Sequence, residues 1–132
     1  MNPWVDIEFF KVFEFDSPDM PGSGVNMNMA FVRKLDLLRK ACGFPLVILS
    51  GFRTATHNAE VGGVDGSAHE LGHAVDIKAI EAGKRFRILQ EAFKLGFRRV
   101  GQGSGFIHID DDITKPQDVC WTYPSTAKRG TT

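Results

Sequence analysis

The sequence has 132 residues, of which 42% are hydrophobic and 24% are charged, as expected for one folded globular domain and not for a disordered chain. Lysine plus arginine and aspartate plus glutamate both total 16, so the zero net charge gives no reason to expect binding to nucleic acid or to an anionic membrane. No apolar run reaches the roughly 18 residues that a membrane-spanning helix needs, so no membrane insertion is expected.

The N-terminus has no basic segment followed by an apolar one, which predicts a protein made in the cytoplasm without a signal peptide. If the substrate lies outside the cell, another factor must then release the protein. Cys42 and Cys120 are far apart in the sequence and predict two buried free thiols. We expect a single domain over residues 1–132, with its core at about 9–123 and a flexible tail at 124–132.

The first third of the chain predicts an aromatic segment, a helix and a strand. Residues 1–15 carry several aromatic side chains, including Phe13, which we expect to pack on the core in a helical or extended conformation. A helix follows, with Asn28 as its N-cap and Gly43 at its C-terminal end. The short apolar run at 44–49 predicts a buried strand.

The middle of the chain predicts a short helix, a strand and a longer helix. Thr54 or Thr56 would cap the short helix. Residues 74–79 alternate in the manner of a strand, and residues 81–95 have the clearest helical period. The predicted apolar face of the longer helix consists of Phe86, Leu89 and Phe93, with Ile88 and Ala92 one residue to the side.

Two strands, at 97–100 and 105–110, are expected to form a hairpin across a glycine-rich turn. Side chains alternate along a strand, so His108 and Asp110 share one face of the second strand while the isoleucines beside them point to the other. Beyond this hairpin only the stretch around Trp121 has the pattern of ordered structure.

The stretch from His69 to Asp76 contains two histidines and two carboxylates and has two possible interpretations. The first is a helical H-E-x-x-H zinc site, in which His69 and His73 bind the metal and Glu70 is the general base. Gly72 inside the motif, and the strand pattern directly after it, disfavour a helix here.

In the second interpretation, His69 and Asp76 bind zinc from a loop and a strand, and His108 is the third ligand. Catalytic zinc sites commonly have three such protein ligands and one open position. A site of this kind would lower the pKa of its water toward 7 and polarise a carbonyl group.

A wider resemblance favours the second interpretation. Residues 67–76 fit S-x-H-x-x-G-x-A-x-D, the signature of zinc D-alanyl-D-alanine peptidases. Residues 50–54 resemble that family's S-G-[FY]-R-[ST], residues 57–63 its H-N-x-x-V-G-G, and residues 106–110 its closing [FI]-[IV]-H-[IVL]-D. The resemblance extends over about residues 9–123. Within the family, the chain looks most like the small, single-domain members, many of them encoded by phages or prophages.

The resemblance implies an α+β fold of the hedgehog/DD-peptidase type. This fold has a central antiparallel sheet, helices packed mainly on one side and the zinc site on the other face. His69, Asp76 and His108 would bind one catalytic Zn²⁺. The enzyme would be a D-Ala-D-Ala-type carboxypeptidase or endopeptidase that hydrolyses amide bonds in the stem peptide of peptidoglycan. A monomeric endolysin, released by a holin, is the setting that the resemblance suggests.

The resemblance also implies roles for three residues around the metal. Arg53 would bind a carboxylate or carbonyl oxygen of the substrate and stabilise the oxyanion. Ser67 would hydrogen-bond either the substrate or a neighbouring group in its own turn. Trp121 would form either a wall of the site or part of the core.

The general base is the least defined part of the predicted site. Many family members have an aspartate or glutamate three residues before the last ligand, where this sequence has Gly105. Asp110 could act as the base or orient His108, and Glu70 and Asp111 are lesser substitutes. The missing acidic residue keeps open a rival function, a non-catalytic, zinc-stabilised module that binds the cell wall or a protein.

Overall fold

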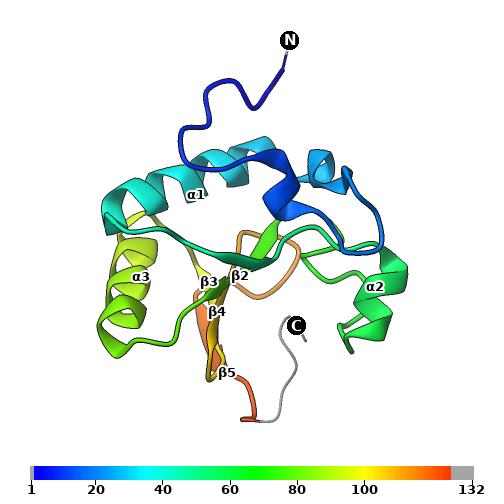
Figure 1. The fold of residues 1–132 in the computed structure, drawn as a ribbon. Helices are drawn as coiled ribbons and strands as arrows, with labels where there is room; N and C mark the ends of the chain where they lie inside the picture. The colour runs from blue at the N-terminus through cyan, green and yellow to red at the C-terminus, as the bar shows by residue number, and fades with distance from the viewer. Residues whose placement is uncertain (1, 126–132) are drawn as a thin grey trace.

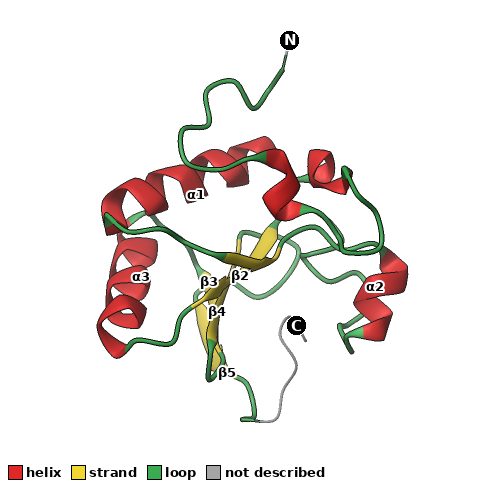
Figure 2. Cartoon of the chain, viewed as in Figure 1, coloured by secondary structure: helices red, strands yellow, loops and turns green. Residues whose placement is uncertain are grey.

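The computed structural model describes residues 2–125, which form an α+β fold around one five-stranded sheet (Figures 1 and 2). The tail predicted to be flexible lies mostly outside the described residues. No helix in the described part of the chain is both long and apolar enough to cross a membrane. In chain order the elements are two 3₁₀ helices, Val12–Phe15 and Ser23–Asn26, then α1 Met29–Cys42, β1 Ile48–Ser50, α2 Ala55–Glu60, β2 Ala74–Lys78, α3 Ala82–Lys94, β3 Arg99–Gln102, β4 Phe106–Asp110 and β5 Val119–Thr122.

The strands lie in the order β1-β2-β4-β3-β5. The predicted hairpin is confirmed as β3 and β4, and the first four strands in this order are antiparallel. β5, however, runs parallel to β3, so the sheet is mixed and the predicted antiparallel sheet is wrong at this edge. The loop at 111–118 passes the end of β3, and β5 therefore begins beside Arg99 and follows the direction of β3.

The hydrophobic core lies between one face of the sheet and the two long helices. α1 and α3 pack against each other over this face, as Figure 1 shows. Because side chains alternate along a strand, the residues between the core positions of β2 and β4 point to the opposite face. The sheet contributes five fully buried side chains to the core: Val75, Ile77, Val100, Ile107 and Ile109.

The two predicted N-caps and the predicted C-terminal glycine are confirmed. The Asn28 side chain accepts a hydrogen bond of 3.0 Å from the backbone N–H of Phe31 at the start of α1. Gly43 ends the same helix in the left-handed region, with φ of 76°. Thr54, one of the two candidates, caps α2 by accepting a 3.1 Å bond from the N–H of His57. Each N-cap side chain satisfies a backbone donor that the helix leaves without a partner, which is typically worth about 1 kcal/mol.

The predicted apolar face of α3 is wrong by about one position. Phe86 and Phe93 are 66% and 49% exposed, whereas Ile88 and Ala92 are buried. Leu89 is partly buried against the core. The helix is rotated so that its smaller side chains face α1 and the sheet, and the phenylalanines lie at the rim.

Two further predictions were wrong in part because hydrophobicity alone does not set burial. In the N-terminal segment Phe13 is 67% exposed, although Phe15 beside it is fully buried. Of the predicted strand at 44–49, only the end pairs with β2, where Ile48 is opposite Ile77. β1 is an edge strand, so this segment is only partly covered.

The cysteines are both free, but only one is buried as predicted. Cys42 lies in the core at the end of α1, and burial raises the pKa of its thiol to about 11. Cys120 is exposed because β5 is an edge strand and its neighbour Trp121 takes the covered face.

Candidate metal centre

The segment before β2 is a series of tight turns and not a helix. The Ser67 carbonyl accepts a bond from the N–H of Glu70, and the His69 carbonyl accepts one from the N–H of Gly72. Gly72 has φ of 75°, and an added Cβ would lie 2.3 Å from the Asn26 carbonyl oxygen, so this turn requires glycine. The helical H-E-x-x-H interpretation is therefore wrong.

The other two polar residues of that motif, Glu70 and His73, form separate contacts. His73 pairs with Asp111, with 2.6 Å between Nδ1 and Oδ1. The Glu70 carboxylate accepts hydrogen bonds from the Asn58 side chain and from the backbone N–H of Gly66. Glu70 and Asp111, the lesser candidates for a general base, are thus engaged in contacts with residues outside the cluster.

The structure brings His69, Asp76 and His108 together in a fully buried cluster. Asp76 on β2 lies directly opposite His108 on β4, on the sheet face away from the helices. His69 reaches the same point from the turn that leads into β2. One ligand atom from each residue lies within 4.8 Å of the other two.

The hydrogen bonds of His69 leave a free lone pair that faces Asp76. Its Nδ1 lies 2.8 Å from the Gly51 carbonyl, which can only accept, so Nδ1 carries the proton. Burial lowers the pKa of His69 and keeps the ring neutral. Nε2 has no hydrogen-bond partner among residues 2–125 and lies 3.4 Å from Asp76 Oδ1. Two buried acceptors at this distance need a proton or a metal ion between them, and the neutral ring leaves that place to a metal ion.

The spacing of these atoms fits a tetrahedral zinc ion. Ligand atoms about 2.0–2.1 Å from zinc are separated by roughly 3.3 Å. Asp76 Oδ1 lies 3.4 Å from His69 Nε2 and 2.9 Å from His108 Nδ1. Burial would raise the pKa of Asp76, but the two imidazoles outweigh it and hold that pKa well below its usual range. The carboxylate is therefore ionised, as a metal ligand must be.

His108 is held between two carboxylates. Its Nε2 lies 2.7 Å from Asp110 Oδ2, and its Nδ1 faces Asp76. Burial opposes protonation, yet Asp110 and Asp76 outweigh it and raise the pKa of His108. With Nε2–H donating to Asp110, a metal ion can take the place of the proton at Nδ1.

Asp110 is itself fixed by two donors. Its Oδ1 accepts a 2.7 Å bond from Arg99 Nε and a 3.1 Å bond from the N–H of Asp112. The imidazole ring of His108 therefore lies between the carboxylates of Asp110 and Asp76. Of the two roles predicted for Asp110, this geometry favours orienting His108.

Arg53 is 1% exposed and binds the second oxygen of Asp76, with 3.3 Å between Nη2 and Oδ2. Its Nη1 donates to Asn58 Oδ1 at 2.9 Å, and its Nε donates to Ser50 Oγ at 3.1 Å. Ser67, predicted to contact substrate or its own turn, is fully buried and donates to the same Asn58 oxygen. Thus Oδ1 of Asp76 faces the two histidines, and Oδ2 binds Arg53.

Asn58 and Arg99 were not recognised as site residues from the sequence. Asn58 joins Arg53, Ser67 and the following loop through both ends of its side chain. Its position in the H-N-x-x-V-G-G motif was the available signal. Arg99 had no such signal, because a charged residue at the start of a strand is ordinary.

Trp121 lies beside the cluster, as a wall of the site would. Its ring centroid is 5.5 Å from that of His108, and the Arg99 guanidinium carbon lies 5.0 Å over its ring. β5 places it there, because Trp121 is the neighbour of Gly101, which in turn is opposite His108.

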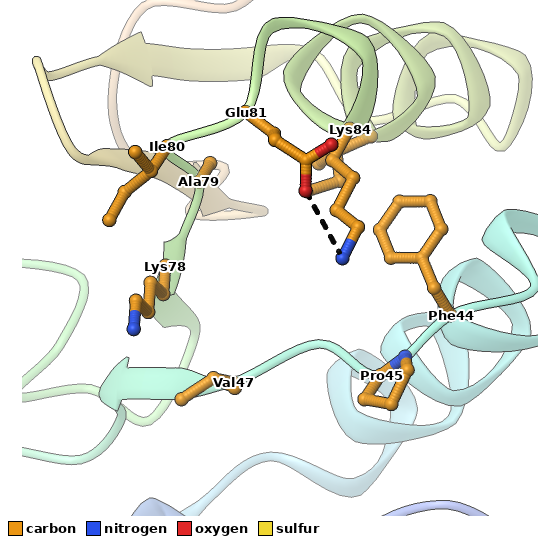
Figure 3. A pocket seen from close by; sticks show the side chains of 9 residues that line it. Phe44, Pro45, Val47, Lys78, Ala79, Ile80, Glu81 and Lys84 are labelled. Atoms are coloured by element: carbon orange, nitrogen blue, oxygen red, sulfur yellow. Dashed lines mark ion pairs between the residues drawn. The ribbon is translucent and has the colours of Figure 1, made fainter.

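A separate pocket of about 360 Å³ lies between the segment before β1 and the start of α3 (Figure 3). Phe44 and Val47 line it together with Lys84, which pairs with Glu81 at 3.6 Å. None of the three clustered residues belongs to its lining. This pocket is therefore not the candidate metal centre.

The buried His-Asp-His cluster, on the sheet face away from α1 and α3, is of the kind that could hold a metal ion, and comparison with known proteins identifies the family. The family model described as Peptidase M15 matches residues 15–110. The zinc D-Ala-D-Ala carboxypeptidase of Streptomyces albus G is 43% identical over 95 residues, which cover 70% of this chain and 36% of that protein.

The chain therefore belongs to the peptidase M15 family, and the resemblance found in the sequence is confirmed. The match spans little more than a third of the length of the Streptomyces protein. The matched range includes all three clustered residues, Arg53 and Asp110, whereas Trp121 lies beyond the family match.

Proposed function

We propose that this chain is a zinc-dependent peptidase that hydrolyses amide bonds in peptidoglycan stem peptides. D-Ala-D-Ala carboxypeptidase and endopeptidase are the two forms of that activity. The observation that carries the proposal is the unpartnered Nε2 of His69, which faces a buried carboxylate within the described residues. The family match and the name of the Streptomyces relative support zinc as the metal and a D-alanyl peptide as the substrate.

In this proposal His69, Asp76 and His108 hold one Zn²⁺, which when bound polarises the substrate carbonyl and activates water for attack. Arg53 keeps Asp76 in place through the oxygen that does not face the histidines. We further propose that Arg53 stabilises the developing oxyanion, as guanidinium groups do elsewhere.

Two other residues complete the proposed site. Asp110 orients His108 by accepting its Nε2–H, and Trp121 forms the wall against which the peptide lies. Ser67 acts through Asn58, which it holds in position for Arg53. In this proposal Ser67 does not touch the substrate.

The alternative function is a zinc-stabilised binding module without catalytic activity. It is favoured by Gly105, which stands where a general base was expected, and by the hydrogen bonds that occupy Asp110. Endolysin use with holin release, and a monomeric state, stay predictions that follow from the sequence resemblance.

Digestion of purified peptidoglycan and of defined muropeptides, followed by mass analysis of the fragments, separates the two functions. We expect the zinc-loaded protein to release D-alanine or cleave the stem peptide, and a chelator to stop the reaction. Arg53→Lys should lose at least about 100-fold in kcat, because one ammonium cannot replace the guanidinium fork. A zinc-loaded wild-type protein that binds peptidoglycan and cleaves none of these substrates would establish the binding module instead.

A further inference from the structure

Tyr123, just after β5, is the only tyrosine of the chain and has a hydroxyl group that the proposed function does not use. The Tyr123 hydroxyl group is buried, and within residues 2–125 its oxygen interacts with the Trp121 indole, whereas no residue there accepts a hydrogen bond from its O–H. Two other buried side-chain atoms of the described residues form no hydrogen bond: His69 Nε2, which faces Asp76, and Glu91 Oε2, which pairs with Lys94 at 3.4 Å. A buried O–H donor without an acceptor costs stability, so its presence calls for an explanation.

The side chain of Tyr123 lies on the face of the sheet that carries the His-Asp-His cluster. Trp121 and Tyr123 are two residues apart and share a face, and Trp121 stacks near His108. The Tyr123 ring packs 5.0 Å from that of Phe106, which shares its strand face with His108. The ring is thereby fixed among residues of the candidate site.

Gly101 makes the space for these two rings. It lies opposite His108 on one side and beside Trp121 on the other. An added Cβ would lie 2.5 Å from Trp121 Nε1 and 2.7 Å from Tyr123 Cε2. Because Gly101 has no side chain, the rings of Trp121 and Tyr123 can occupy the space beside His108, a proposed zinc ligand.

The chemistry of the hydroxyl makes it a hydrogen-bond donor. Burial raises the pKa of Tyr123 well above its usual range, and the charges of Asp76 and Asp110 raise it further. The phenol therefore keeps its proton. The nearby Trp121 indole is itself only a donor, so it cannot accept that proton.

We propose that the Tyr123 hydroxyl donates a hydrogen bond to a carbonyl or carboxylate oxygen of the peptide substrate. This inference rests on the proposed function and adds a substrate-binding residue to it. The acceptor that the described residues do not supply is the oxygen that a bound peptide brings to this face. The proposal also explains why a donor is kept buried beside the cluster.

The test is Tyr123→Phe, which removes one oxygen atom and keeps the ring that packs on Phe106. Thr122→Val is the matched control, because it removes a hydroxyl from the same stretch but at an exposed position on the opposite face. For each variant we would measure zinc content, melting temperature, and kcat and KM on an acetylated peptide ending in D-Ala-D-Ala. Calorimetry would give the affinity of the zinc-free protein for the same peptide.

For Tyr123→Phe we expect about a tenfold loss in kcat/KM, the size of one lost hydrogen bond to a substrate oxygen. The zinc-free variant should bind the peptide at least about fivefold more weakly. Zinc content should not change, and the melting temperature should stay or rise, because an unsatisfied donor is gone. Thr122→Val should match the wild type in all four measurements.

Wild-type activity and affinity in Tyr123→Phe, or a lower melting temperature with unchanged affinity, would overturn the proposal and leave the proposed function intact. If the wild type binds the peptide but does not cleave it, the hydrolase function fails. A loss of affinity in the variant would then still support the Tyr123 contact. A wild-type protein that neither binds nor cleaves the peptide would overturn both.

Discussion

Asp110 is the residue whose role depends most on a single contact, the 2.7 Å hydrogen bond from His108 Nε2. A carboxylate behind a metal-binding histidine fixes the ring and its tautomer, and its loss typically lowers metal affinity by about 10- to 100-fold. We therefore expect Asp110→Asn to bind zinc more weakly by that factor, measured by competition with a chromogenic chelator. A variant that keeps wild-type zinc affinity but loses kcat would identify Asp110 as the general base instead.

Gly105 offers the opposite experiment, a gain of function. An added Cβ there would meet no heavy atom within 4 Å, so a side chain fits without repacking. If the enzyme lacks a general base, Gly105→Asp should raise kcat on a D-Ala-D-Ala peptide by at least about tenfold, since such a base contributes about 10²–10⁴-fold. Gly105→Asn, with the same shape and no charge, is the control. Equal kcat values in the two variants would mean that the aspartate does not act as a base from position 105.

At the scale of elements, the loop between β4 and β5 is fixed by Asp112. This buried carboxylate accepts bonds from the backbone and side chain of Thr114 and pairs with Lys115, which also reaches the Gly66 carbonyl. Burial would raise the pKa of Asp112, but the bonds from Lys115 and Thr114 outweigh it and lower the pKa to about 2. The loop that carries the chain to β5 and Trp121 is thus tied to the turn before His69.

Because the pKa of Asp112 is lower in the folded state, its ionised form stabilises the fold, and the stability should fall as the pH falls. This contribution is fully present above the unfolded pKa of about 3.9 and is lost as the pH falls toward 2. We expect Asp112→Asn to lower the free energy of unfolding by about 1–3 kcal/mol at pH 7, measured by urea denaturation. The difference between variant and wild type should shrink below pH 4. A difference that stays constant from pH 7 to pH 2.5 would show that ionisation of Asp112 is not its source.

The elements also show which parts of the site can be predicted from sequence. His69, Asp76 and His108 were found because β2 and β4 have clear alternation and the spacing matches a family motif. Asn58 and Tyr123 were missed because their importance depends on which loops meet across the sheet. The rotation of α3 was missed because an exposed phenylalanine and a buried one produce the same helical period.

For the whole molecule, the metal should contribute to folding as well as to catalysis. Without it, the ligand set holds a neutral imidazole nitrogen and an ionised carboxylate face to face inside the protein. A ligand that binds only the folded state at about 1,000 times its Kd stabilises that state by about 4 kcal/mol. In a domain of this size that free energy corresponds to a melting temperature higher by roughly 10 °C or more.

Chelation of the purified protein should therefore lower its melting temperature by at least roughly 10 °C, and added Zn²⁺ should restore it, as scanning calorimetry would record. His108→Ala removes a proposed ligand and should abolish the response to zinc. His73→Ala is the matched control, because His73 pairs with Asp111 outside the cluster and the response should persist. If His73→Ala abolished the response while His108→Ala kept it, the metal would be bound by the other histidine pair, and the arrangement of β2 and β4 around Asp76 would need another explanation.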